Sequence, residues 1–95
     1  MNVANDAQRA SPPKPTARKA SPVNAKFEDK AKSLVREAMA AKGVTVDQLT
    51  ARLALIGVEM SSGGVGNKIS RGGFSSAFLL QCMDAMEFDL KIEAR

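Results

Sequence analysis

The sequence predicts a compact all-α domain of four to five helices that follows a disordered N-terminal tail. Three observations lead to this prediction. Apolar residues recur at intervals of three and four from Phe27 onward, which is the spacing of one helix face. Residues 45–48, Thr-Val-Asp-Gln, have the form of a helix-initiating capping box. Glycines at positions 43, 57 and 72 fall where the periodic segments end, as is typical of helix C-termini.

The size and composition of the chain limit the classes of function. With 95 residues, no His and one Cys, the sequence predicts one small domain without an internal disulfide or a Cys–His metal site. It offers no nucleophile–base pair, so we expect no enzyme, no cofactor and no small-molecule substrate. No apolar run reaches the ~18–20 residues of a membrane span. The N-terminus lacks a secretion signal, so we expect a cytoplasmic protein without a membrane partner.

Basic charge is concentrated at the N-terminus. Residues 1–25 are rich in Pro, Ala, Ser and Lys, and we expect them to be disordered; residues 26–95 are expected to form the domain. Residues 1–26 hold five cations and one anion, whereas residues 27–95 hold nine of each. A cationic tail on a neutral domain favours a polyanionic partner, nucleic acid being the commonest, although it is equally typical of a solubilising terminus.

The first two helices are delimited by local signals. The first should begin near Phe27 and end at Gly43. The second should begin at the capping box, in which the side chains of Thr45 and Gln48 bond each other's backbone N–H groups, and end at Gly57. Their inner faces are expected to consist of Phe27, Ala31, Leu34, Val35, Ala38 and Met39 in the first helix, and of Leu49, Leu53 and Ile56 in the second.

The third segment, residues 61–73, has the sequence SSGGVGNKISRGG. A phosphate-binding loop needs contiguous Gly-Lys-Ser/Thr after a strand, but Asn67 separates Gly66 from Lys68. A flexible linker is a stronger alternative, because three glycines oppose a helix by ~2–3 kcal/mol. The spacing of Val65 and Ile69 nevertheless favours a short helix that starts at Ser61 or Ser62 and ends at Gly72.

The fourth helix and the C-terminal segment complete the predicted domain. Ser75 is the expected N-cap of the fourth helix. Its inner face is expected to consist of Phe78, Leu79, Cys82, Met83 and Met86. The end of the chain, FDLKIEAR, alternates apolar and charged residues, which predicts a short strand, unless the helix continues instead. An unpaired strand edge would suit a homodimer.

The order of these elements is typical of a helix-turn-helix, in which a capped helix, a glycine turn and a short helix follow one another. Residues 32–88 also resemble a family of small bacterial lambda-repressor-like domains of uncharacterised function. The resemblance is most specific in residues 67–72, NKISRG, and 74–82, FSSAFLLQC, with further likeness in residues 43–45, 56–59 and 64–66. One difference is that Leu53 and Val65 lie twelve positions apart, more than in that family, so a longer second helix and turn are expected.

The resemblance implies double-stranded DNA as the partner, with the third helix in the major groove, in a transcriptional regulator or a mobile-element accessory. The residues expected at base edges are Ser61, Ser62, Gly63, Gly64 and Asn67. Those expected at phosphates are Thr45, Gln48, Lys68 and Arg71. Capping alone would explain Thr45 and Gln48, and the helix dipole would explain Lys68 and Arg71. The alternative function is an antitoxin- or adaptor-like protein-interaction module on the same fold, without specific DNA binding.

Overall fold

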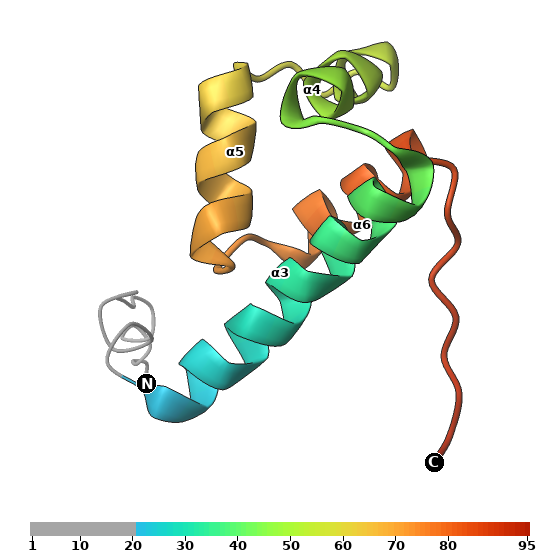
Figure 1. Ribbon diagram of the computed structural model, residues 1–95. Helices are drawn as coiled ribbons and strands as arrows, with labels where there is room; N and C mark the ends of the chain where they lie inside the picture. The colour runs from blue at the N-terminus through green and yellow to red at the C-terminus, as the bar shows by residue number, and fades with distance from the viewer. Residues whose placement is uncertain (1–20) are drawn as a thin grey trace, which may run out of the picture.

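The computed structural model describes residues 21–95, which form four helices: α3 (Pro22–Lys42), α4 (Val46–Leu55), α5 (Ser62–Arg71) and α6 (Ser76–Ala85). The all-α prediction is therefore confirmed, with the lower of the two expected helix numbers in this part of the chain. Helix α3 is the longest, and both α3 and α4 pack against α5 and α6 (Figure 1). Within residues 21–95, no helix is long and apolar enough to cross a membrane.

A hydroxyl side chain begins every helix of the described chain. The four N-caps are Ser21, Thr45, Ser61 and Ser75, and each accepts a hydrogen bond from the backbone N–H three residues later. The capping box is complete, with 3.1 Å from the Gln48 N–H to Thr45 Oγ1 and 2.9 Å from the Thr45 N–H to Gln48 Oε1. Such caps typically contribute ~1 kcal/mol each. Three of the four were predicted.

The first helix starts earlier than the sequence analysis expected. Ser21 caps it and Pro22 is its first residue, which is a favourable position for proline because its missing N–H would have no helical partner there. Helix α3 therefore takes up the last four residues of the segment predicted as a disordered tail. Ser21 is the N-cap, and the remaining residues of that segment, 1–20, lie outside the described residues.

The helices end at residues in the left-handed region. Gly43, Gly57 and Gly72 have φ values of 65°, 90° and 75°. Just after α3, α4 and α6, one backbone N–H donates back to the carbonyl five residues earlier, at 2.8–2.9 Å. This is the hydrogen bond of a Schellman motif. Helix α6 differs because the left-handed position is Glu87, with φ 66°. A residue with a Cβ costs ~1–2 kcal/mol in this conformation.

The core lies where the four helices meet. Its largest fully buried side chains are Val35, Leu49, Leu53, Val65, Cys82 and Met86. Three residues expected on inner faces are instead exposed: Phe27 by 58%, Leu34 by 45% and Ile56 by 42%. Phe27 and Leu34 share a helical stripe with the buried Ala38, but Phe27 only lines a shallow groove beside Gly72, Gly73 and Phe74 after α5. Ile56 lies at the C-cap of α4, where the chain turns and Val58 packs against the core in its place.

The expected C-terminal strand is wrong for the isolated chain. Residues 88–95 form neither a strand nor a continuation of α6. The helix cannot continue because Glu87 reverses the backbone direction. A strand needs a neighbour for its backbone hydrogen bonds. Among residues 21–95 none lies beside this segment, which runs away from the helices (Figure 1).

Candidate nucleic-acid interface

Helix α5 is a regular helix in spite of its glycines. Val65 is fully buried and Ile69 is 3% exposed. Burying two such side chains contributes ~3–6 kcal/mol, which exceeds the ~2–3 kcal/mol that the three glycines cost. The Ser61 hydroxyl adds an N-cap by accepting from the Gly64 N–H at 3.0 Å. Packing and capping together therefore decide against the flexible linker.

The outward ridge of α5 carries the polar residues. At ~100° per residue, Asn67 lies about opposite the midpoint between Val65 and Ile69. Gly63, Asn67, Ser70 and Arg71 are all exposed and lie on this side. Helix α5 contains two cations, Lys68 and Arg71, and no acidic residue. The ridge is therefore accessible to a partner and carries positive charge at its C-terminal end.

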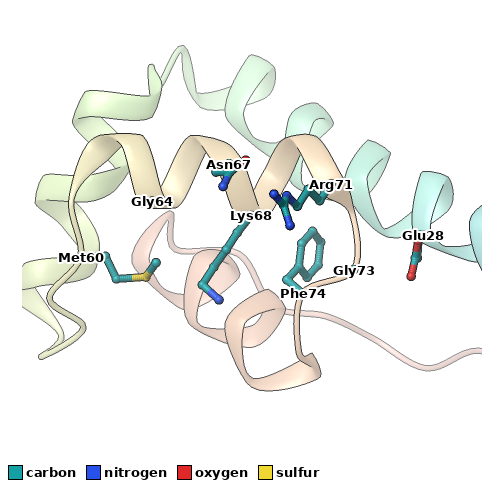
Figure 2. Close-up of a pocket in the computed structure, with 8 residues that line it drawn as sticks. All are labelled: Glu28, Met60, Gly64, Asn67, Lys68, Arg71, Gly73 and Phe74. Atoms are coloured by element: carbon teal, nitrogen blue, oxygen red, sulfur yellow. The ribbon is translucent and has the colours of Figure 1, made fainter. Parts of the chain in front are cut away.

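A groove of about 600 Å³ runs along one side of this ridge. It is lined by Glu28, Met60, Gly64, Asn67, Lys68, Arg71, Gly73 and Phe74. Figure 2 shows these residues along α5, with Met60 near one end and Glu28, from α3, beyond the other. The Lys68 ammonium points toward α6 and lies 5.6 Å from the centre of the Phe78 ring. The groove thus combines two cations, an amide and two apolar walls with one carboxylate at its edge.

The glycines of α5 do not share one structural role. A Cβ on Gly63 would meet nothing closer than the Ser61 hydroxyl oxygen, at 4.0 Å. A Cβ on Gly64 would lie 3.2 Å from the same oxygen, and one on Gly66 would lie 3.6 Å from Val46 Cγ1. Internal packing therefore gives no reason for a glycine at position 63, where the helix backbone is open to the outside.

The N-terminus of α4 lies beside the middle of α5. Val46, between Thr45 and Gln48, is the neighbour of Gly66. A second groove of about 310 Å³ separates the two helices from α3 and is lined by Arg36, Met39, Val46, Gly66, Ile69 and Ser70. An α-helix N-terminus attracts anions, and Arg36 adds a cation at the same place. Thr45 and Gln48 are exposed, although their capping bonds occupy one oxygen atom of each side chain.

Helix α3 fixes the C-terminal end of α5. The Lys32 ammonium donates to the Ser70 carbonyl at 3.2 Å. A Cβ on Gly72 would lie 2.6 Å from the Glu28 carbonyl oxygen, so only glycine permits this close approach of the two backbones. These contacts set the orientation of the residues at the end of the ridge, Arg71 included.

The structure brings together most of the predicted site. Ser61, Gly63, Asn67, Lys68 and Arg71 are exposed, whereas Ser62 and Gly64 are half-buried. Thr45 and Gln48 lie at the N-terminus of α4 and not on the ridge; of that terminus, Val46 lines the second groove. Sequence reasoning missed Glu28, Arg36, Ser70 and Phe74. Only Ser70 could have been found, because it is one turn from Asn67; the others come from α3 or from the turn after α5.

The turn between the two central helices is longer than a usual helix-turn-helix connection. Six residues, 56–61, separate α4 from α5, against the 3–4 residues of a typical motif. The extra distance between Leu53 and Val65 thus lies in the connection, since α4 ends two residues after Leu53. Val58 and Met60 pack against the core, so this connection is held in place.

Comparison with known proteins gave one result. Neither the curated proteins nor the solved structures contain a match to this chain. Residues 27–90 match a family described as a domain of unknown function (DUF6471). The match begins within α3, spans α4, α5 and α6, and ends in the C-terminal segment, so it includes both grooves. The chain therefore belongs to the DUF6471 family.

Proposed function

We propose that this protein is a DNA-binding helix-turn-helix protein of the bacterial cytoplasm, acting as a transcriptional regulator or a mobile-element accessory on a lambda-repressor-like arrangement of helices. The observation that supports this most is the outward ridge of α5. It combines an exposed Asn67, the cation Arg71 and a glycine whose missing Cβ serves no internal packing, on a helix that has a second cation, Lys68, at the side of the ridge and no acidic residue. A helix with these features suits the major groove, where side chains contact base edges.

Each group has a distinct role in the proposed complex. Asn67 pairs with an adenine through its amide, and Gly63 lets the backbone approach the bases. Arg71 and Lys68 contact phosphates on one side of α5. The N-terminus of α4, with Thr45, Gln48 and the nearby Arg36, contacts phosphates on the other side. Base contacts would supply specificity and phosphate contacts would supply affinity.

A selection experiment tests the proposal. The full chain is incubated with a random duplex pool at two salt concentrations, and the bound sequences are identified. The variant Lys68→Ala/Arg71→Ala should bind the selected duplex more weakly and reduce the slope of log K against log salt by ~1.8. The control Lys26→Ala/Lys30→Ala removes the same charge from α3, about 200° around that helix from Glu28, and should change binding little. No enriched sequence, or equal losses in both variants, would refute specific DNA binding.

The basic N-terminus contributes affinity without sequence preference in this proposal. Residues 1–20 contain four cations, Arg9, Lys14, Arg18 and Lys19. If each of them contacts a phosphate, deleting residues 1–20 lowers the salt slope by up to ~3.6 and leaves the selected sequence unchanged. This deletion keeps the Ser21 cap of α3 intact. An unchanged slope would remove the tail from the proposal and leave the α5 ridge in it.

A second candidate function is a protein-interaction module. The groove beside α5 supports it, because the Met60 and Phe74 walls and the Glu28 carboxylate suit a peptide with apolar and basic side chains better than a phosphate backbone. The two functions respond differently to Glu28→Gln. This change should leave DNA binding equal or stronger, because it removes a negative charge, whereas it should weaken a basic peptide ligand.

A further inference from the structure

The C-terminal segment is the part of the described chain with the least explanation so far. Phe88 packs against the core, and its backbone N–H donates to the Met83 carbonyl at 2.8 Å. After this anchor the chain is extended and leaves the body (Figure 1). We call residues 89–95 the C-terminal arm. Leu90 is 45% exposed and Ile92 is fully exposed, at 102%, so this isolated chain covers about half of Leu90 and none of Ile92.

The arm has the sequence pattern of a strand without a partner. Its residues are Asp89, Leu90, Lys91, Ile92, Glu93, Ala94 and Arg95. Successive side chains of an extended chain point to opposite sides, so the four charged residues share one side and the three apolar residues share the other. No strand of the described part of the chain lies beside its backbone to accept or donate ladder hydrogen bonds.

Among the antiparallel registers that bring the charged sides of two arms together, the one centred on Ile92 gives the most attractive charge pairs within the arm: four, against two for a centre at Leu90 or at Ala94. When Ile92 lies opposite Ile92 of a second copy in an antiparallel pair, Lys91 lies opposite Glu93 and Asp89 lies opposite Arg95. By symmetry each pair occurs twice, and every cross-strand charge pair is attractive. Centring the pair on Lys91 instead places Lys91 opposite Lys91 and Asp89 opposite Glu93, which repel. Centring it on Glu93 brings two glutamates together.

We propose that the arm forms a two-fold antiparallel strand pair with the same arm of a second copy, centred on Ile92, and that this pair makes the protein a homodimer. The occupant is a second copy because the charge pattern is complementary to itself in this register. Leu90, Ile92 and Ala94 of both copies then share one face, and the exposed Ile92 side chains contact each other across the axis. Phe88 anchors the start of each strand on its own domain. This inference does not depend on DNA binding.

Charge reversal tests the register in the full-length protein. Lys91→Glu should place glutamates opposite each other at two symmetric positions and weaken dimerisation by about tenfold or more. Glu93→Lys should do the same with lysines. The double variant Lys91→Glu/Glu93→Lys restores attraction and should recover the dimer. Sedimentation equilibrium measures the dissociation constant of each protein. Circular dichroism should be unchanged for all of them, because the arm lies outside the four helices.

Cysteine crosslinking tests the alignment independently. Antiparallel partners directly opposite each other have Cα atoms ~4.5–5.5 Å apart, which a disulfide can span. Ile92→Cys should therefore form a disulfide dimer under mild oxidation, whereas Leu90→Cys should not, because its copies would be ~13 Å apart along the strands. An equimolar mixture of Leu90→Cys and Ala94→Cys should crosslink. The native Cys82 does not interfere, because it is fully buried.

Three results would overturn the inference. A wild-type protein that sediments as a monomer up to millimolar concentration has no such dimer. A dimer that both single charge reversals leave intact is formed by another surface. A dimer in which Leu90→Cys crosslinks as fast as Ile92→Cys has a different register. Any of these results together with intact DNA binding would contradict only this inference and not the proposed function.

Discussion

Gly63→Ala separates stability from function on helix α5. Gly63 is inside the helix and does not have a positive φ. A Cβ there would meet nothing closer than the Ser61 hydroxyl oxygen, at 4.0 Å. The substitution should therefore bring the full helix-propensity gain of alanine, ~0.5–1 kcal/mol. For a domain of this size that is an increase in melting temperature of roughly 2–8 °C.

The same methyl group should weaken DNA binding. In the proposed complex it lies between the α5 backbone and the base edges, so it should cost ~1–3 kcal/mol, or about fivefold or more in the dissociation constant. Thermal unfolding and a fluorescence anisotropy titration with the selected duplex measure the two effects. Gly64→Ala is the matched comparison for stability. Its Cβ would lie 3.2 Å from the Ser61 oxygen, so its gain should be smaller.

Two outcomes for Gly63→Ala would refute this reasoning. A lower melting temperature would mean that position 63 is not an open helical site. A higher melting temperature with unchanged affinity for the selected duplex would mean that Gly63 does not lie against the bases, and the glycine would then have no role in binding.

Three further substitutions test the fold. Gly72→Ala should destabilise the domain by about 2–4 kcal/mol in urea unfolding, because φ is +75° and the new Cβ would lie 2.6 Å from the Glu28 carbonyl oxygen; a loss below ~1 kcal/mol would contradict the close approach of α3 and α5. Glu87→Gly should stabilise it by about 1 kcal/mol, because it removes left-handed strain and loses only an exposed ion pair with Lys42, 3.8 Å long; a net loss would show that the ion pair dominates. Burial raises the pKa of the Cys82 thiol from 9.0 to about 11, so the folded chain keeps this proton where the unfolded chain has lost it. The free energy of unfolding should therefore fall as the pH rises from 9.0 to about 11, by up to ~3 kcal/mol, and Cys82→Ala should flatten that fall; an equal fall in both proteins would assign it to other groups.

Much of the fold could be predicted because its signals are local. The caps Thr45, Ser61 and Ser75 and the glycine ends depend on residues within one turn of each other, so the sequence alone identifies them. Ser21 was missed because the Pro- and Ala-rich stretch before it is typical of a tail. The exposed faces of α3 and α4 were predicted less well. Helical spacing places Phe27 and Leu34 on one stripe with Ala38, but only the packing of α5 and α6 decides which part of that stripe is covered.

The part of the candidate site on α5 could be predicted from the sequence, whereas the part on α3 could not. Val65 and Ile69 define the inner side of α5, and this places Asn67 and Arg71 outward by helical geometry alone. Glu28 and Arg36 could not be anticipated, because they come from α3, about forty or thirty residues earlier in the chain. Their position beside α5 depends on tertiary packing, including the close contact at Gly72. The charge of the grooves is therefore a property of the fold and not of the α5 sequence.

The central claim, that the outward ridge of α5 faces a DNA duplex, is tested most directly by amide chemical-shift mapping. The isotopically labelled full-length protein is titrated with the selected duplex. The account predicts that the largest shifts fall on residues 61–71, with Gly63, Asn67 and Arg71 among them, and on the N-terminus of α4 near Thr45. Shifts confined to α3 or the C-terminal arm, or no shifts at saturating duplex, would contradict it.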